Sequence, residues 1–483
     1  MNADTRDTPS SGQVVVIGGG IAGLAAAHRL ASAGRRVTVL EATTTLGGKL
    51  RAGRIEGVPI DLGAESMLAR RPEAVDLARA VGLGDRLQPP ATTTAAVWTR
   101  DALRPMPKGH VMGVPGDAAA LSGLLSAEGL ARIARERDLP PVGPGDLGDD
   151  VAVGRFVADR LGHEVVDRLV EPLLGGVYAG DAYALSMRAA VPKLFDAART
   201  HGTLTDAVRA LQGAAGAQPG PAFMGIEGGI GTLPGAVADA VTALGGEILT
   251  DTPVHALAPS ARGGWDIRTG DLVRHADAVI LATPAWAASP LLAAACPAAA
   301  TELAAVEYAS MALVTLAFRR ADAEAALPAG SGFLVPPVDG RTIKASTFST
   351  RKWKWTDEGA GDLLVLRTSV GRYGEEDHLH REDADLVAVS LKDLAEATGL
   401  AARPVATEVT RWIGGLPQYP VGHLARVARI REAVAALPAA LRVCGAVYDG
   451  VGIPATIASA RRAADEILAT PTPAPGTPGD ARE

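Results

Sequence analysis

Three glycines close to the N-terminus have the spacing of a phosphate-binding turn. Gly18, Gly20 and Gly23 form a GxGxxG pattern directly after residues 14–17, an unbroken apolar run that is typical of a buried strand. Each glycine meets a separate physical need: a tight turn, close approach of the backbone to a pyrophosphate, and close packing of a helix on the strand. The amides at the start of that helix would face the phosphates. The pattern therefore predicts a site for a dinucleotide.

The segments on either side of the turn complete a βαβ unit over residues 13–41. Residues 21–33 have a helical composition, Gly34 ends that helix, and residues 36–40 form a second apolar run. Glu41 stands at the end of the second strand, where a carboxylate can accept hydrogen bonds from ribose hydroxyls and disfavours a 2′-phosphate. A glycine turn alone can be purely structural, so the prediction depends on the whole unit. The predicted contacts are Gly18, Gly19, Gly20, Ile21, Ala22, Gly23, Glu41 and Ala42.

Three further segments favour a flavin over a nicotinamide dinucleotide. Residues 46–49 resemble the second motif of the amine-oxidase-like FAD superfamily, and residues 61–66 supply small side chains where a backbone must pass close to an isoalloxazine ring. Residues 451–453 precede a helix predicted over 455–468, whose positive N-terminus would stabilise a reduced, anionic flavin. Alternatively, the basic residues of the second motif are solvated charges, and the last segment is an ordinary helix start. The further predicted contacts with the FAD cofactor are Gly48, Lys49, Arg51, Gly63, Ala64, Glu65, Ser66, Val254, Trp412, Val451, Gly452 and Ile453.

Composition and charge argue against several classes of protein. A chain of 483 residues exceeds what one hydrophobic core usually serves, so we expect more than one domain. The net charge of −7 argues against a nucleic-acid partner, which would need a basic surface. Cys296 and Cys444 are far apart and lack metal-ligand spacing, which indicates a reducing cytoplasm, no disulfide framework and no metal site. Because Cys444 is predicted inside a strand over residues 441–447, we expect noncovalent FAD.

The sequence also bears on localisation. Residues 1–12 are polar and lack the apolar stretch of a secretory leader, and apolar runs such as 278–295 contain prolines and are shorter than the ~20 residues of a membrane helix. We expect a cytoplasmic protein. Residues 118–137 have apolar side chains at helical spacing and end in Arg132, Arg135 and Arg137, which allows peripheral contact with the inner face of a membrane. Core packing is the explanation of this pattern that we favour.

The order of the predicted elements indicates an α/β fold with interleaved domains. We assign residues 13–91, 227–290 and 426–469 to a Rossmann-type FAD-binding domain, and residues 92–226 to an inserted, mainly helical domain. Residues 291–425 contain β-rich runs at 312–318, 342–348, 363–370 and 404–412, which predict a mixed sheet forming one wall of a substrate cavity. Residues 1–12 and 470–483 are predicted to be disordered tails.

Several motifs beyond the FAD segments resemble those of the oxygen-dependent porphyrinogen oxidases of haem biosynthesis. They are GAESMLAR at residues 63–70, the segment 171–181 that contains GGVYAGD, LSMRAAVP at residues 185–192, and the segment 411–423 that contains PQYPVGH. The resemblance extends from Val14 to about Leu468. It implies an FAD enzyme that removes six hydrogens from a porphyrinogen in two-electron steps, with molecular oxygen as acceptor and hydrogen peroxide as co-product.

The resemblance is to the Gram-positive and actinobacterial branch, which implies coproporphyrinogen III as substrate, coproporphyrin III as product and hand-over to a downstream enzyme. The plant and animal branch has an arginine near the positions of Thr94, Ala95 and Ala96, and this sequence has none there. Protoporphyrinogen IX remains an alternative substrate. A flavin-bearing porphyrin carrier without catalysis, and an amine or carotenoid oxidase, are alternatives of other kinds.

The chemistry demands little of the side chains. A hydride can leave a meso carbon for the flavin and pyrrole protons can pass to water, so positioning should supply most of the catalysis and no catalytic base is predicted. The substrate propionates would need cations at the cavity mouth, for which the candidates are Arg70, Arg71, Lys344 and Lys352, each equally explicable as a surface charge. Lys352 begins a Lys-Trp-Lys-Trp run that could line a flat cavity or form a solvated strand edge. His163 and His423 are interpreted as structural.

Overall fold

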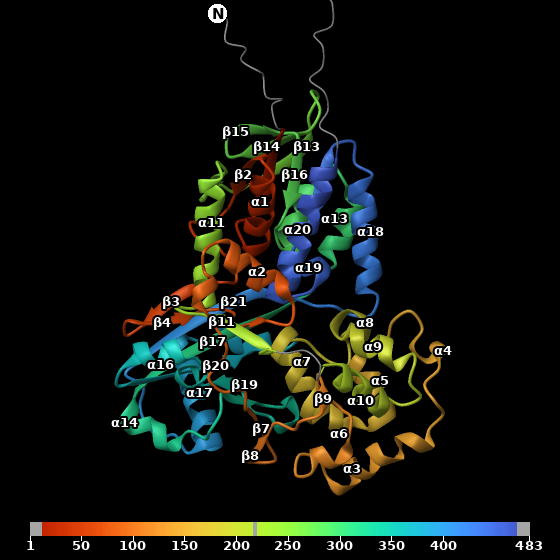
Figure 1. Cartoon of the computed structure of the whole chain (residues 1–483), viewed down its shortest axis with the longest axis vertical. Coiled ribbons are helices and arrows are strands. Elements are labelled where there is room, and N and C mark those ends of the chain that lie inside the picture. Colours follow the sequence, from red (N-terminus) through yellow and green to blue (C-terminus); the bar gives the residue numbers. More distant parts are fainter. Residues whose placement is uncertain (1–11, 216–219, 471–483) are drawn as a thin grey trace, which may run out of the picture.

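The computed structural model describes residues 12–215 and 220–470. Figure 1 shows one sheet with its covering helices at the top, a mixed sheet at the lower left and a helical part at the lower right. The predicted α/β class is confirmed. The two predicted tails, 1–12 and 470–483, lie outside the described residues except for Gly12 and Thr470. Among the described helices, none combines the length and the apolar composition needed to cross a membrane.

The upper part is built on a five-stranded parallel sheet whose strands come from distant segments. Its order is β12 (Glu247–Leu249), β2 (Arg36–Leu40), β1 (Gln13–Ile17), β16 (Ala278–Leu281) and β22 (Ala440–Val443). Every neighbouring pair is parallel. The apolar runs of the three central strands are buried, as expected for a parallel sheet that is covered on both faces.

Helices and a small sheet cover the two faces of this parallel sheet. On one face, α1 (Ile21–Ser32), α11 (Leu233–Ala243) and α20 (Ile453–Ala469) pack over alternate residues of β1, β2 and β16. The other face packs against α12 (Ala285–Leu292), α13 (Pro297–Ala304), α18 (His423–Ala435) and the antiparallel strands β13 (Ala256–Pro259), β14 (Trp265–Thr269) and β15 (Leu272–Ala276). The carboxyl ends of β1 and β16 therefore remain free to form a ligand site.

A seven-stranded sheet forms the lower left part. Its order is β21 (Ala406–Pro417), β17 (Tyr308–Arg319), β20 (Leu363–Val370), β19 (Ile343–Thr347), β18 (Gly332–Leu334), β7 (Ala96–Thr99) and β8 (Ala102–Pro105). One face packs against α17 (Asp383–Thr398). The register shifts at two places, between Ala309 and Met311 and between Ile343 and Ala345, and both shifts lie close to the candidate site described below.

The helical part has a core of its own. It contains α3 (Ala127–Ala134), α5 (Val153–Leu161), α7 (Glu171–Tyr178), α9 (Pro192–Ala198) and α10 (Leu204–Ala215). The helix that leads into α7 begins with α6 (His163–Val165) and continues as the π-helical turn η4 (Val166–Val170). In Figure 1, α7 lies between the helical part and the mixed sheet, and its residues contact β18 and β19.

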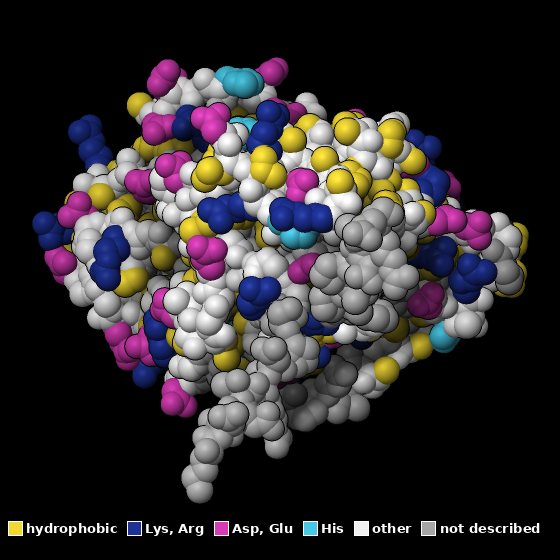
Figure 2. Space-filling view, turned by 90° about the horizontal axis from the view of Figure 1, so that it is seen from above, with side chains coloured by type: hydrophobic (Ala, Val, Ile, Leu, Met, Phe, Trp, Pro, Cys, Tyr) yellow, Lys and Arg dark blue, Asp and Glu magenta, His cyan; other side chains and the backbone are white. Residues whose placement is uncertain are grey.

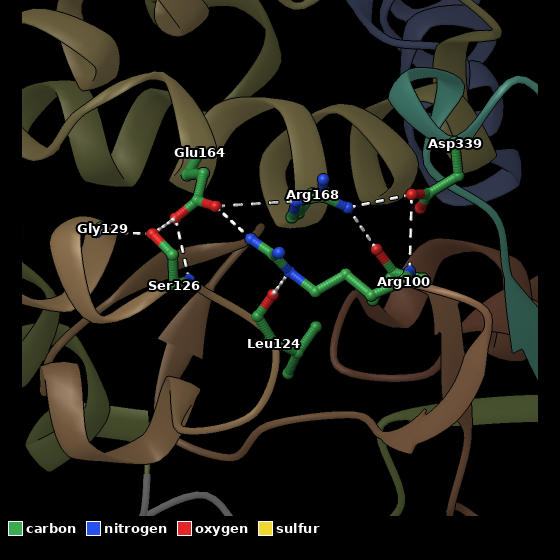
Figure 3. Close-up of polar contacts among 8 residues, drawn as sticks. Arg100, Leu124, Ser126, Gly129, Glu164, Arg168 and Asp339 are labelled. Atoms are coloured by element: carbon green, nitrogen blue, oxygen red, sulfur yellow. Dashed lines mark hydrogen bonds and ion pairs between the residues drawn. The ribbon is translucent and has the colours of Figure 1, made fainter.

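A polar network fixes that helix against the mixed sheet (Figure 3). Glu164 accepts hydrogen bonds from the Ser126 amide and hydroxyl at 3.0 and 2.8 Å and pairs with Arg100. Arg168, one turn further along, pairs at 3.0 Å with Asp339, which lies in the turn between β18 and β19. Because both carboxylates are held by arginines, the network sets the separation between α7 and the sheet.

Several predicted elements differ from the structure. The helical spacing noted over residues 118–137 corresponds to three short elements, η2 (Ala118–Leu121), α3 and η3 (Arg135–Asp138), and Ser126 caps the start of α3. The strand expected over 441–447 ends at Val443, and Gly445, with φ +125°, turns the chain into α19 (Ala446–Asp449), so Cys444 lies beyond the strand. The Lys352–Trp355 segment joins α15 (Ser349–Lys352) to α16 (Lys354–Ala360) and is not a strand edge.

Both ends of the range assigned to the inserted helical domain form strands. Residues 96–105, assigned to the inserted helical domain, form β7 and β8 of the mixed sheet. Residues 223–226, at the other end of that domain, form β11 (Phe223–Ile226), which pairs with β5 (Met67–Leu68) and β6 (Leu87–Gln88). These strands are too short for periodicity to indicate their partners. The ranges as a whole remain a prediction.

Candidate active site

The glycine turn lies at the carboxyl end of β1 and has the geometry of a ligand cradle. A Cβ on Gly23 would lie 1.8 Å from the Gly18 carbonyl oxygen, so only glycine lets α1 pack this closely on the turn. Gly18 itself has φ +110°. A Cβ on Gly20, by contrast, would meet no protein atom within 4 Å. The backbone of Gly20 therefore borders open space, where a phosphate group could approach it closely.

Glu41 is held at the rim of the same turn. Its Oε2 atom accepts a hydrogen bond from the Gly19 amide at 2.7 Å, and its Oε1 atom accepts one from the Thr43 amide at 2.9 Å. The Thr252 amide donates to the Glu41 carbonyl at 2.8 Å, which brings the segment containing Val254 beside the carboxylate. Ala42 is exposed next to it. The structure thus brings the predicted adenosine contacts Glu41, Ala42 and Val254 together.

The second motif packs directly on the first. The Gly47 amide donates to the Gly19 carbonyl at 2.9 Å, and a Cβ on Gly48 would lie 3.4 Å from the Gly20 Cα atom. Lys49 follows, and burial lowers its pKa to about 8. Within the described parts of the chain, no carboxylate pairs with Lys49. An unpaired ammonium group beside a glycine turn is suited to a pyrophosphate.

Trp412 connects the second motif to the predicted flavin-lining segment. Its indole nitrogen donates to the Leu62 carbonyl at 2.8 Å, and the Arg51 guanidinium lies 4.9 Å from the centre of its ring. A Cβ on Gly63 would lie 2.0 Å from the Lys49 carbonyl oxygen, so the two segments are in backbone contact. Ala64 is exposed and Ser66 half-buried on the open side of this segment.

Glu65 anchors the segment through two buried ion pairs. Its carboxylate lies 2.5 Å from Lys352 Nζ and 3.2 Å from Arg367 Nη2, and only 8% of the residue is exposed. Burial alone would raise the pKa of Glu65, but Arg367 and Lys352 hold it below its usual range. The positive charge of Lys352 is therefore neutralised by Glu65 inside the protein. Sequence reasoning did not identify Arg367, for which the available signal was a charged residue in the middle of the apolar strand β20.

A second buried carboxylate, Asp61, binds the start of the same segment to a neighbouring turn. Asp61 accepts hydrogen bonds from the Ile230 and Gly231 amides at 3.0 and 2.7 Å. Burial raises the pKa of Asp61 to about 6, although these amides and Arg367 oppose the rise. Asp61 thereby links residues 61–66 to the start of α11.

The third predicted flavin segment lies at the start of α20. Gly452 is the residue before the helix and has no side chain to cap it, which leaves amides of the first turn available to a ligand. Ile453 packs into the core shared with α1, and Val451 packs against the helical part that contains α7. Cys444 is fully buried, and burial raises the pKa of its thiol to about 12.

The four candidate substrate cations are not brought together. Arg70 and Arg71 are exposed between β5 and α2 (Pro72–Ala80), and Arg71 pairs with Glu73 at 2.8 Å. Lys344 is 7% exposed on β19. The glycines of α7 are a feature that the sequence did not single out for this role. A Cβ on Gly175 would meet nothing within 4 Å, and one on Gly176 only the Leu334 side chain at 3.9 Å.

The two histidines considered earlier make protein contacts. The ring of His423 stacks on Tyr419 with centroids 4.2 Å apart, and its Nε2 atom lies 2.8 Å from the Val447 carbonyl oxygen. Burial lowers the pKa of His423 to about 4. His163 Nδ1 lies 3.1 Å from the Tyr183 hydroxyl. Neither contact places a histidine at the glycine turn.

Comparison with known proteins decides the class of this site. The family model described as flavin containing amine oxidoreductase matches residues 21–468. The chain belongs to this family. It is a flavin-dependent oxidoreductase, and its cofactor is FAD. These assignments agree with the open space at Gly20, the unpaired Lys49 and the uncapped start of α20.

Individual relatives of this flavin oxidoreductase match almost its whole length. A coproporphyrinogen III oxidase of Mycobacterium tuberculosis is 38% identical over 462 residues, covering 94% of this chain and 96% of that protein. A coproporphyrinogen III oxidase of Bacillus subtilis is 32% identical, covering 94% and 97%. The crystal structure of a putative protoporphyrinogen oxidase from an Exiguobacterium species has a TM-score of 0.83 at 33% identity, covering 95% and 99%. The family resemblance indicated by the sequence motifs is confirmed.

Proposed function

We propose that this protein oxidises coproporphyrinogen III to coproporphyrin III in haem biosynthesis, with oxygen as the electron acceptor and hydrogen peroxide as co-product. The observation that carries the proposal is the 38% identity, over nearly the full length, to a coproporphyrinogen III oxidase. The glycine face of α7 opposite β18 supports it, because a flat macrocycle needs a wall without side chains. Protoporphyrinogen IX is the second candidate substrate, favoured by the name of the Exiguobacterium protein.

Noncovalent FAD is proposed to bind along the three motifs. Gly18–Gly23 and Lys49 would hold the pyrophosphate, Glu41, Ala42 and Val254 the adenosine, and Gly48, Arg51, residues 63–66, Trp412 and residues 451–453 the flavin end. The buried thiol of Cys444 supports a noncovalent cofactor, because it is enclosed and protonated. Acid precipitation should leave the yellow colour in the supernatant, and colour retained by the precipitate would contradict this.

Bound FAD supplies a two-electron acceptor for a hydride from a meso carbon of the substrate. The protein's contribution is positional. The Glu65 ion pairs keep residues 63–66 rigid, and the Arg100–Glu164 and Arg168–Asp339 pairs hold α7 at a constant distance from the sheet. Rigid walls on both sides would orient the macrocycle, and pyrrole protons can leave to water without a side-chain base.

Anaerobic mixing of the purified yellow protein with each porphyrinogen tests the proposal. We expect coproporphyrinogen III to bleach the flavin absorbance, faster and at lower concentration than protoporphyrinogen IX does, and readmitted air to restore it with release of peroxide. A clear advantage of protoporphyrinogen IX would change the substrate assignment. No bleaching by either compound would favour a porphyrin carrier, and rapid bleaching by a polyamine or phytoene would favour an amine or carotenoid oxidase.

We further propose that the protein acts in the cytoplasm, without a nucleic-acid partner, and passes its porphyrin to a downstream haem-pathway enzyme. On the face shown in Figure 2, the lysine and arginine side chains are interspersed with acidic side chains. Such a surface does not favour binding to a polyanion. Recovery of most of the protein in washed membranes after lysis would contradict the cytoplasmic assignment and favour the peripheral contact considered for residues 118–137.

A further inference from the structure

Lys344 lies at a β-bulge in β19. Ile343 pairs with Val370 and Ala345 pairs with Ser369, so Lys344 is the extra residue between two ladder positions. Ile343 packs into the core under α17, whereas Ala345 pairs with Leu334, whose side chain approaches Gly176 of α7. Because Ile343 faces the core under α17, Lys344 points to the opposite face of the sheet, where its side chain reaches Met311. Bulges are frequent beside active sites.

Lys344 is buried without a countercharge. The residue is 7% exposed, and the contact described for its ammonium group is with the Met311 sulfur at 3.8 Å. Its charged neighbour is Arg372, and burial together with this like charge lowers the pKa of Lys344 to about 7. An isolated buried cation is costly, and proteins normally pair such groups.

The carboxylates of the surrounding elements are engaged elsewhere. Asp393 of α17 accepts from the Thr342 and Ile343 amides, each at 2.9 Å. Glu171 of α7 accepts from the Ala182 amide at 2.7 Å, and burial raises its pKa to about 7. Glu375 pairs with Arg372 at 3.5 Å. The countercharge of Lys344 is therefore not supplied by the described part of the chain.

The free end of Lys344 lies on the face of the mixed sheet that also carries Met311 and Trp412. Met311 is only partly buried, and it pairs across the β17–β21 ladder with Trp412, whose indole is bound to Leu62. On the other side, the open glycine face of α7 lies opposite Leu334. The ammonium group is thus located where the mixed sheet, α7 and the predicted flavin contacts meet.

We infer that Lys344 binds one carboxylate of the substrate where α7 meets the mixed sheet. This inference rests on the proposed function, because a porphyrinogen brings its own carboxylates on flexible arms. A carboxylate at this position supplies the charge that the protein lacks and forms a charge-assisted hydrogen bond. Arg70 and Arg71 are exposed and Lys352 is paired with Glu65, so Lys344 differs from them in being both buried and available.

The test compares porphyrin binding to oxidised holoenzyme, which requires no turnover. Coproporphyrin III and its tetramethyl ester are titrated, in one detergent-containing buffer, against wild type, Lys344→Met and Lys344→Arg. We expect Lys344→Met to weaken binding of the acid about tenfold to a hundredfold, the range for one charge-assisted hydrogen bond, and to leave ester binding unchanged. Lys344→Arg should retain most of the affinity for the acid. Lys354→Met is the matched control, because the Lys354 side chain is 75% exposed and pairs with Glu358 on its own helix.

Several outcomes would overturn the inference. Equal affinity of wild type and Lys344→Met for the acid would do so, and so would an equal loss for acid and ester, because that indicates a packing defect. FAD content checks folding, and Lys344→Gln replaces the methionine variant if that variant loses FAD. Wild type that binds coproporphyrin III but is not bleached by porphyrinogens would contradict only the proposed function. If porphyrinogen bleaches the flavin of the wild type but Lys344→Met binds coproporphyrin III as tightly as the wild type does, only the role of Lys344 would be contradicted.

Discussion

Removing the buried charge of Lys344 should stabilise the protein in the absence of porphyrin. The change is Lys344→Met, which replaces the ammonium group by an apolar end of similar length beside Met311. The pKa of Lys344 falls from 10.5 to about 7 in the folded protein. At about 1.4 kcal/mol per pKa unit, this difference corresponds to a penalty of at most about 5 kcal/mol. The variant should avoid that penalty.

The pH dependence follows from the direction of this pKa change. The folded state releases the proton at a lower pH than the unfolded state, so between pH 7 and pH 10.5 the unfolded chain binds more protons. Raising the pH through this window therefore increases wild-type stability relative to the variant. The advantage of Lys344→Met should be greatest at pH 7 and below, shrink by about 1.4 kcal/mol per pH unit above it, and vanish above pH 10.5.

Urea unfolding of the holoenzymes at pH 6.5, 8 and 9.5, followed by flavin fluorescence and circular dichroism, measures the difference. Lys354→Met serves as the exposed control and should show no pH-dependent difference, since surface pairs contribute at most about 1 kcal/mol. A stability difference between Lys344→Met and wild type that stays constant across the three pH values would refute the reasoning. Lower stability of the variant at pH 6.5 would do so as well, since it would mean that the charge has a partner.

Three other predictions concern the flavin site. Gly20→Ala should lower FAD affinity at least about tenfold in titrations of apoprotein. It should have little effect on apoprotein stability, because the added Cβ meets no protein atom within 4 Å. Gly235→Ala, whose added Cβ is equally free of contacts, is the control and should leave FAD affinity unchanged. Lys49→Met should weaken FAD binding about tenfold and reduce its salt dependence, and an unchanged dissociation constant would contradict a pyrophosphate contact. Glu65→Gln should lower the free energy of unfolding by about 3–5 kcal/mol, because it leaves two buried cations uncompensated, whereas Asp362→Asn in an exposed pair should cost less than about 1 kcal/mol.

Lys352 and Lys344 illustrate why sequence reasoning about single charges is weak. Both were candidates for binding substrate at a cavity mouth, and the residues next to them in the sequence do not indicate which one has a partner in the fold. The structure pairs Lys352 with Glu65, which is far away in the sequence. Among the residues that it describes, it places no carboxylate beside the buried Lys344. The difference depends on which strands lie side by side, and that is a non-local property.

The sequence by itself was sufficient for the nucleotide-binding unit, the α/β class and the family. Gly18, Gly20, Gly23 and Glu41 act through local backbone geometry, since a turn, a helix start and a strand end recur at characteristic spacings. Only the tertiary structure revealed Arg367 beside Glu65, the contact of the buried Lys344 with Met311, and the open glycine face of α7. These features arise where segments far apart in the chain meet, and burial, pairing and free space at such a junction leave no periodic signal in any one segment.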